Sequence, residues 1–352
     1  MEEKRILYLD YLRIFALLAV VILHVSALDW AKQPVSSMNW QVFNFYNSLV
    51  RFCVPVFVMI SGACFLDKER EITIKKIFNR YILRIITAFV FWTILYAIIS
   101  TLIEENNLID GSKAKFFIAS IIYGHYHMWF LYLIAGLYLI TPLLRKITED
   151  KALTEYFIVL SVLFASLTKI SVFVPAIDEV VGKLLDKASI NFVLGYTCYF
   201  VIGHYLHTYK ISSKLKMVIY TLGCAGLLVT IFGNSLLSVK AGTPLETFYD
   251  YLMPNVLCVS CMIFMMFKEK VLCKNDDSKA VTNTKAINLA KLTFGAYLVH
   301  DIFLMIYKKI GLTMTIFTPV LLIPIVSVIV FGLSLLVAFV ISKIPILNKY
   351  IM

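Results

Sequence analysis

Arg13 and His24 stand eleven positions apart in an apolar stretch near the start of the chain. At 100° per residue, a helix brings them to within about 20° of one face, separated by about 16 Å along the axis. Asp10 lies one turn before Arg13 and can pair with it. A neutral imidazole so placed can act as a general base. The alternative interpretation is a snorkelling arginine with a hydrogen-bonded core histidine, which explains each residue but not their shared face.

Two further polar patterns interrupt apolar sequence. The Ser61-Gly62 step puts a hydroxyl beside a bare backbone, where either a neighbouring helix or a ligand can approach closely. Arg80 and Arg84 are one helical turn apart, and the planar fork of donors on arginine suits phosphate groups. Anchoring of the cytoplasmic end by positive charge explains the same pair of arginines equally well.

Histidines gather in two later segments. His125 and His127 flank a tyrosine, but no acidic or third histidine ligand follows at a usual spacing, so we expect no metal ion. A wall of an acceptor site, together with Trp129, or an aromatic belt at the membrane interface accounts for this segment. Tyr297 and His300 lie one turn apart with a carboxylate next to the histidine, and a core role is as consistent as a functional one.

The composition indicates which elements must position these residues. Of 352 residues, 60% are hydrophobic and 16% charged, against roughly 25% charged in soluble domains. A membrane helix needs about 20 apolar residues. The hydrophobic residues of the chain therefore suffice for about ten spans, which leaves few residues for a domain outside the membrane. We expect an all-α polytopic membrane protein forming a single transmembrane domain over 1–352. The expected spans are 7–28, 46–66, 82–103, 126–144, 155–175, 190–207, 217–238, 250–267, 292–312 and 318–342.

The basic residues orient these spans. With a cytoplasmic N-terminus, 22 Lys and Arg residues fall inside and nine outside, and Arg13 and Arg51 within spans complete the 33. This bias predicts that both termini are cytoplasmic. The net charge of +11 is therefore an orientation signal, and we expect no nucleic-acid partner.

Taken in series, these segments resemble the acyltransferase-3 family of integral membrane acyltransferases, as a stand-alone membrane domain of the O-acetyltransferase type. The resemblance rests on five motifs in family order, namely Arg13 to His24, Val54 through Gly62, Arg80 with Arg84, His127 through Leu131 followed by Tyr138 and Pro142, and Gly295 through His300.

The resemblance implies an acyl-CoA donor, usually acetyl-CoA, and an acceptor hydroxyl on a cell-surface glycan or its lipid-linked precursor. It implies polysaccharide modification in the cell envelope by a multi-pass protein of the bacterial plasma membrane. It assigns catalysis to His24, Arg13 and Asp10, donor binding to Arg80, Arg84, Ser61, Tyr297 and His300, and acceptor binding to Arg51, His127 and Trp129. No metal is expected.

Two mechanisms and one rival function stay open at this point. His24 can serve as a general base or can carry the acyl group transiently. A transporter of a small polar molecule or of an acyl group also places charges within spans. The sequence lacks the matching pair of Gly/Pro-interrupted helices that is typical of such transporters, and this favours the enzyme.

Overall fold

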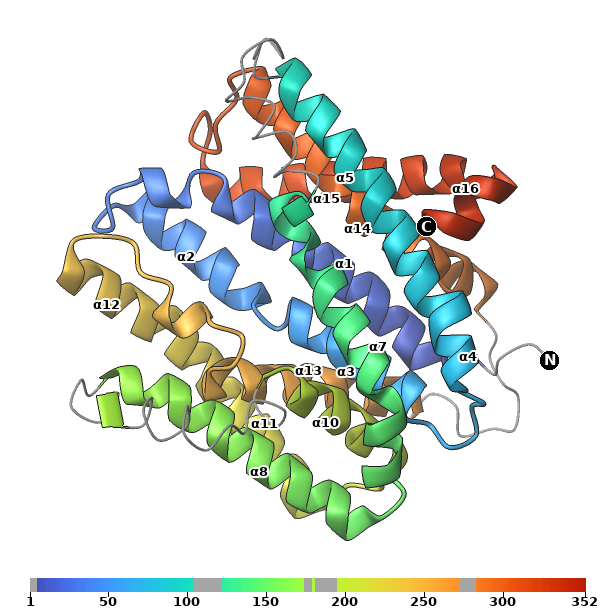
Figure 1. The fold of residues 1–352 in the computed structure, drawn as a ribbon. Coiled ribbons are helices and arrows are strands. Elements are labelled where there is room, and N and C mark those ends of the chain that lie inside the picture. The colour runs from blue at the N-terminus through green and yellow to red at the C-terminus, as the bar shows by residue number, and fades with distance from the viewer. Residues whose placement is uncertain (1–4, 104–121, 174–178, 181–194, 273–282) are drawn as a thin grey trace. The chain divides into compact units, whose positions relative to one another are not determined.

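The computed structural model describes residues 5–103, 122–173, 179–180, 195–272 and 283–352, and within them it contains helices and turns but no strand (Figure 1). The elements are α1 (Leu7–Ala27), η1 (Trp30–Lys32), α2 (Met38–Val50), α3 (Cys53–Phe65), α4 (Ile74–Lys76), η2 (Ile77–Ile82), α5 (Leu83–Ile103), η3 (Tyr126–Met128), α7 (Trp129–Ile147), α8 (Lys151–Ile170), η4 (Ser171–Phe173), α10 (Thr197–Thr208), α11 (Ser213–Leu228), η5 (Val229–Gly233), α12 (Asn234–Ala241), η6 (Thr247–Tyr249), α13 (Pro254–Leu272), α14 (Thr284–Lys309), α15 (Pro319–Ser342) and α16 (Pro345–Tyr350).

The chain is a multi-pass membrane protein, as the sequence predicts. Nine described helical segments are long and apolar enough to cross a membrane: Leu7–Lys32, Met38–Phe65, Ile74–Leu102, Tyr126–Ile147, Lys151–Phe173, Ser213–Ala241, Thr247–Lys270, Thr284–Lys309 and Pro319–Ser342. The expected span at 190–207 coincides with α10 only from Thr197 onward, since residues 190–194 lie outside the described part of the chain.

Some boundaries differ from the sequence prediction. The second span begins at Met38 rather than at residue 46, because α2 carries polar residues that lower its apolar character but are buried within the protein. The third begins at Ile74 rather than at residue 82, because the helical path starts within the basic segment. Between the expected spans 250–267 and 292–312, the chain is helical to Leu272 and again from Thr284, and residues 273–282 lie outside the described part of the chain.

Local sequence explains where several helices start. The side chains of Ser37, Asp150 and Ser212 each accept a hydrogen bond from the backbone N–H three residues later, at 3.2, 2.7 and 3.3 Å. Such caps satisfy donors that the first turn of a helix leaves without intrahelical partners. Pro319 occupies the first turn of α15, where its missing N–H costs nothing.

The chain divides into two compact units. Unit 1 comprises Met1–Glu71 and Thr141–Asn283, and unit 2 comprises Ile72–Ile140 and Thr284–Met352. The chain thus passes between the units at three places, and one of them lies within α7. In unit 1, α1 packs on α2, α3 and α13, α3 packs on α10, and α11 packs on α13. In unit 2, α14 packs on α15 and α5, and α16 packs on α5.

Glycines permit the closest helix contact in unit 1. A methyl group on Gly62 of α3 would overlap the carbonyl of Phe200 in α10, and one on Gly203 of α10 would overlap the carbonyl of Met59 in α3. Small residues at such crossings let two membrane helices meet backbone to backbone. The Ser61-Gly62 step therefore serves close helix packing, one of the two interpretations that the sequence allows.

The last residues of the chain are bound into unit 2. The Trp92 indole donates a hydrogen bond to the carbonyl oxygen of Ile351 at 2.9 Å, and the Tyr96 hydroxyl donates to that of Leu298 at 2.8 Å. Both donors come from α5. These bonds fix α5 against the C-terminal segment and α14.

Candidate active site

The first helix carries the predicted polar stripe, defined here as Asp10, Arg13 and His24. α1 is helical over all three positions, so the expected common face is realised. Asp10 is buried, and its Oδ1 lies 3.9 Å from Arg13 Nη1 and 3.3 Å from Arg5 Nη1. The expected ion pair is present, but Arg5, which sequence reasoning missed, approaches the carboxylate more closely. The Asp10 carboxylate thus lies between two guanidinium groups and can hold both of them.

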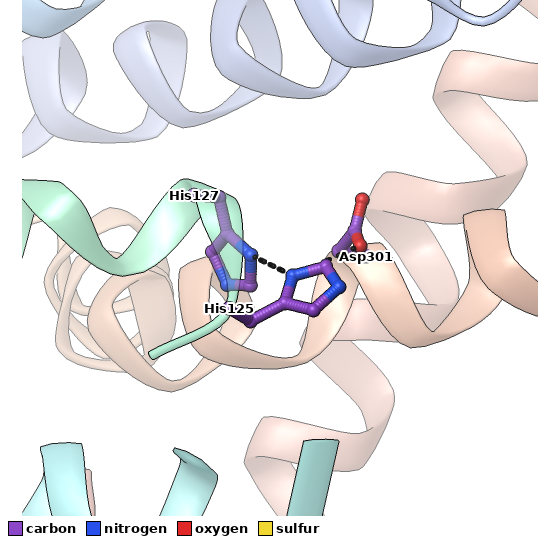
Figure 2. Close-up of side chains that lie close together, drawn as sticks. All are labelled: His125, His127 and Asp301. Carbon is purple, nitrogen blue, oxygen red and sulfur yellow. Dashed lines mark hydrogen bonds and ion pairs between the residues drawn. The ribbon is translucent and has the colours of Figure 1, made fainter. Parts of the chain in front are cut away.

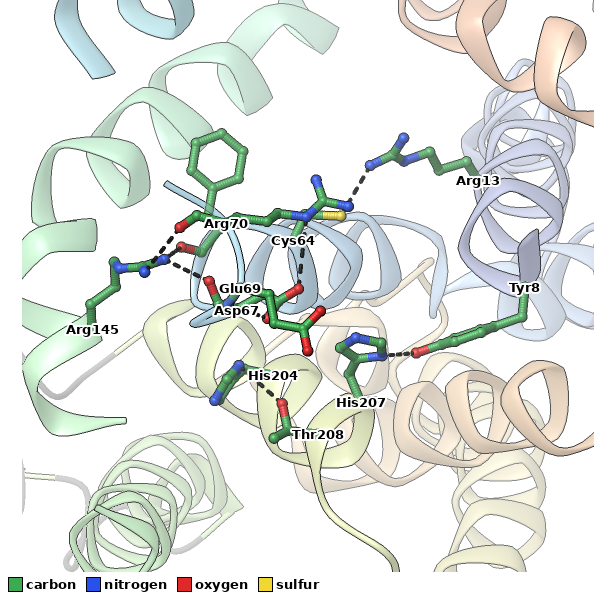
Figure 3. Close-up of polar contacts among 11 residues, drawn as sticks. Tyr8, Arg13, Cys64, Asp67, Glu69, Arg70, Arg145, His204, His207 and Thr208 are labelled. Atoms are coloured by element: carbon green, nitrogen blue, oxygen red, sulfur yellow. Dashed lines mark hydrogen bonds and ion pairs between the residues drawn. The ribbon is translucent and has the colours of Figure 1, made fainter. Parts of the chain in front are cut away.

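Arg13 connects the stripe to α3. Its Nη2 lies 3.5 Å from the Sγ atom of Cys64, the last-turn cysteine of α3 (Figure 3). His24 occupies the last turn of α1 and is half-buried, so it is reachable from outside the protein core. The stripe therefore runs from a fixed cation to an imidazole about three turns away.

Ser61, which precedes the packing glycine of α3, makes its side-chain hydrogen bond within that helix. Its hydroxyl donates a hydrogen bond to the carbonyl of Phe57 at 3.0 Å, on its own helix. This bond within the helix engages the hydroxyl hydrogen of Ser61. The hydroxyl oxygen can then only accept a hydrogen bond from a bound molecule.

The guanidinium of Arg145 binds the chain at the C-terminal end of α3. Arg145 donates to the carbonyl oxygens of Phe65 at 2.8 Å, Asp67 at 2.9 Å and Arg70 at 3.1 Å (Figure 3). Phe65 is the last residue of α3, where helix carbonyls lack intrahelical partners and a positive charge favours the helix dipole, while Asp67 and Arg70 lie in the chain that follows. Arg145 thereby fixes the chain that follows α3.

α10 is connected to the start of α1. The Tyr8 hydroxyl lies 2.6 Å from Nδ1 of His207, and His204 Nδ1 lies 3.4 Å from the Thr208 hydroxyl (Figure 3). Lys268 donates to the carbonyls of Leu206 and His207 at 2.5 and 3.0 Å. These histidines therefore belong to the packing of unit 1.

Arg51 lies in unit 1, where its guanidinium sits 4.0 Å from the ring centroid of Tyr249. Beside it is a buried polar network that the sequence prediction missed. Asn44 Oδ1 accepts from the Tyr249 hydroxyl at 2.5 Å and from Asn234 at 3.2 Å. The signal was present, because Asn44, Ser48 and Arg51 recur at the three- and four-residue spacing of one helix face.

His127 is the centre of a cluster in unit 2. The ring is 2% exposed, and its Nδ1 lies 3.0 Å from Nδ1 of His125 (Figure 2). His125 Nδ1 in turn lies 3.4 Å from Oδ2 of Asp301, whose Oδ1 accepts a hydrogen bond from the Tyr126 hydroxyl at 2.6 Å. Burial lowers the pKa of His125 below its ordinary value, so its imidazole is neutral near pH 7.

Tyr297 and His300 lie beside His127. The Tyr297 hydroxyl donates to the main-chain carbonyl of His127, and the rings of His127 and His300 have centroids 5.2 Å apart. His300 Nδ1 lies 2.5 Å from the carbonyl of Tyr297, so this nitrogen carries the proton and Nε2 carries the lone pair. Trp129, two residues after His127, is 38% exposed and has its ring centroid 6.4 Å from that of Phe130.

Of the two predicted donor-binding arginines, Arg80 lies within a π-helical turn, η2, which the sequence prediction did not include, and Arg84 follows it at the start of α5. Arg80 is exposed and its guanidinium lies 5.6 Å from the ring centroid of Tyr81. The Arg84 Nε donates to the main-chain oxygen of Met352, and the guanidinium lies 5.6 Å from the Phe294 ring centroid. π-turns are frequent at functional sites because they shift side chains off the regular helical register.

The eleven predicted site residues thus fall into two groups. Unit 1 holds Asp10, Arg13, His24, Arg51 and Ser61, and unit 2 holds Arg80, Arg84, His127, Trp129, Tyr297 and His300. Within unit 1 the structure brings Asp10 to Arg13, and within unit 2 it brings His127, Tyr297 and His300 together.

Comparison with known proteins gives one finding. A family model described as "Acyltransferase domain" matches residues 6–343. No curated protein and no solved structure matches the chain.

Proposed function

This chain belongs to the acyltransferase-3 family of membrane acyltransferases, and we propose that it is an O-acyltransferase using cytoplasmic acyl-CoA. The acceptor in this proposal is a hydroxyl of a cell-surface glycan or of its lipid-linked precursor, and the acyl group is acetyl. The proposed location is the bacterial plasma membrane.

One observation carries this proposal, namely the polar stripe of α1. Asp10 and Arg13 are paired at 3.9 Å near one end of the helix, and His24 lies on the same face near the other end. An ionisable residue inside a membrane span is costly and by default suggests function. Asp10 holds Arg13 in place, Arg13 presents a positive charge to an anionic donor, and His24 supplies a base.

In the proposed transfer step, His24 first accepts and then returns one proton. The imidazole takes the proton of the acceptor hydroxyl as its oxygen attacks the thioester carbonyl, and a tetrahedral intermediate forms. Its collapse breaks the C–S bond, and the CoA thiolate leaves and receives the proton from the imidazolium. The products are an acyl ester and CoA. The alternative in which the imidazole itself carries the acyl group proceeds through the same residue.

Arg80 and Arg84 are proposed to hold phosphates of the donor. The charge pattern of the sequence places them at the cytoplasmic face, where acyl-CoA is made. Arginine presents several N–H groups in a fixed fork, so a guanidinium with one N–H engaged by a carbonyl retains others for a phosphate. The exposure of Arg80 suits a first contact with a dissolved donor.

The experiment uses inverted membrane vesicles from cells that make the protein, supplied with acetyl-CoA labelled in the acetyl group. We expect label in the glycolipid fraction, in a form released by mild base, together with equivalent free CoA. Vesicles without the protein serve as the control. Uptake of a small polar molecule without consumption of acetyl-CoA would instead establish a transporter.

A further inference from the structure

Three potential metal ligands converge in unit 2 from two distant parts of the sequence. One ligand atom from each of His125, His127 and Asp301 lies within 4.8 Å of the others (Figure 2). The two histidines stand at the start of the helical segment that leads into α7, and Asp301 lies in α14. We name these three residues the His-His-Asp cluster.

The spacing in this cluster matches the edges of a metal coordination shell. His125 Nδ1 lies 3.0 Å from His127 Nδ1 and 3.4 Å from Asp301 Oδ2. With metal–ligand bonds of about 2.0–2.1 Å, adjacent ligands are about 3.3 Å apart in a tetrahedron and about 2.9 Å apart in an octahedron. The distance from His125 to His127 is close to the octahedral value and the distance from His125 to Asp301 is close to the tetrahedral one. A rotation of the His127 or Asp301 side chain can shorten the distance between those two ligands.

Surrounding groups orient the three side chains. The Tyr126 hydroxyl donates to Oδ1 of Asp301, which turns Oδ2 toward His125. The Tyr96 ring stacks on His125 with centroids 4.4 Å apart and an interplanar angle of 20°. Hydrogen bonds to ligating carboxylates and packing around ligating rings are the usual outer layer of a metal site.

The charge of the cluster also suits a cation. The Asp301 carboxylate faces the cluster, with its Oδ2 3.4 Å from His125 Nδ1. A carboxylate that is 3% exposed within a membrane span needs compensation, and a divalent cation supplies it more fully than a neutral histidine does.

We propose that His125, His127 and Asp301 bind a divalent transition-metal ion of the zinc class, with further coordination positions open to water or a hydroxyl. Two imidazoles and one carboxylate form the ligand set that zinc uses where it keeps an open position. The sequence argument against a metal rested on the lack of an acidic ligand near the two histidines. The fold overturns that premise, because Asp301 is adjacent in space although it is far away in the chain.

The test measures metal binding by the full-length, untagged protein purified in detergent, so it does not depend on the proposed acyl transfer. The protein is equilibrated with Zn²⁺, desalted and analysed for bound zinc. We expect one zinc per chain in the wild type and loss of that zinc in His125→Ala and Asp301→Asn. Tyr126→Phe should keep the ligands but weaken affinity about 10–100-fold. His207→Ala, a histidine hydrogen-bonded outside the cluster, is the matched control and should bind zinc as the wild type does.

A second measurement uses only the wild type and so remains decisive if a variant fails to fold. X-ray absorption of the zinc-loaded protein should show two imidazoles and oxygen ligands, and Co²⁺ should give a ligand-field spectrum that Zn²⁺ abolishes. Wild-type protein that retains no zinc, or a shell containing sulfur, would overturn the proposal. An equal amount of bound zinc in the wild type and in Asp301→Asn would also overturn the proposal. The three residues would then be a hydrogen-bonded group that does not bind the metal.

Discussion

Replacement of Gly62 by alanine should destabilise unit 1 by an amount that the geometry defines. The added methyl carbon would lie 2.6 Å from the carbonyl carbon of Phe200 and 2.9 Å from its Cα. Carbon atoms in contact normally stand about 3.5–4.0 Å apart, so α3 and α10 must separate by about 1 Å. The obstructing atoms are backbone and cannot rotate away. Overpacking costs about 1–3 kcal/mol in free energy of unfolding. Because this contact is rigid, we expect a cost near the upper end of that range.

The assay is thermal unfolding of the purified protein in one detergent. A loss of about 3 kcal/mol corresponds to a decrease in Tm of about 4 °C for a chain of this size. Gly332→Ala in α15 is the matched control, because a methyl group there meets nothing within 4 Å. Restricting the unfolded chain should make that variant neutral or more stable by about 0.4–1 kcal/mol. Equal Tm values for Gly62→Ala and Gly332→Ala would refute the close crossing of α3 and α10.

Three further substitutions test other parts of the account. Arg145→Ala removes charged hydrogen bonds to three carbonyls and should lower the free energy of unfolding by about 2 kcal/mol, measured by denaturant titration; unchanged stability would contradict the cap. Asn44→Leu removes the side-chain oxygen that accepts hydrogen bonds from the Tyr249 hydroxyl and from Asn234, and it should cost about 1–3 kcal/mol in the same titration, whereas a neutral effect would mean that the network adapts. Arg84→Ala should raise the KM for acetyl-CoA more than that for the acceptor, and the opposite pattern in steady-state kinetics would remove Arg84 from the donor site.

Local features of the sequence predicted much of this structure. The apolar runs predicted the membrane helices, and the eleven-residue spacing of Arg13 and His24 predicted their common face on α1. The Ser61-Gly62 step predicted a close approach, which α10 makes. These features depend on helical periodicity and side-chain size, both of which are readable from a short window of residues.

The features that could not be predicted depend on the tertiary fold. The start of α2 was hidden because Asn44 looks unsuited to a membrane until Tyr249 and Asn234 supply its hydrogen bonds. The role of Asp301 was hidden because nothing in the sequence places it beside His125. A partner that comes from a distant segment has no local signature, and buried polar groups are decided by such partners.

The central claim is that this membrane protein transfers an acyl group to a surface glycan through His24. The most direct measurement is mass spectrometry of surface glycans from three otherwise identical cell lines, carrying the wild-type gene, the His24→Ala gene or no gene. We expect an ester-linked acyl group on glycans with the wild-type protein. With His24→Ala, the protein should be present in the membrane at the same level and acylation should fall by on the order of 10²-fold or more. Full acylation with His24→Ala, or the same glycans with and without the gene, would contradict the account.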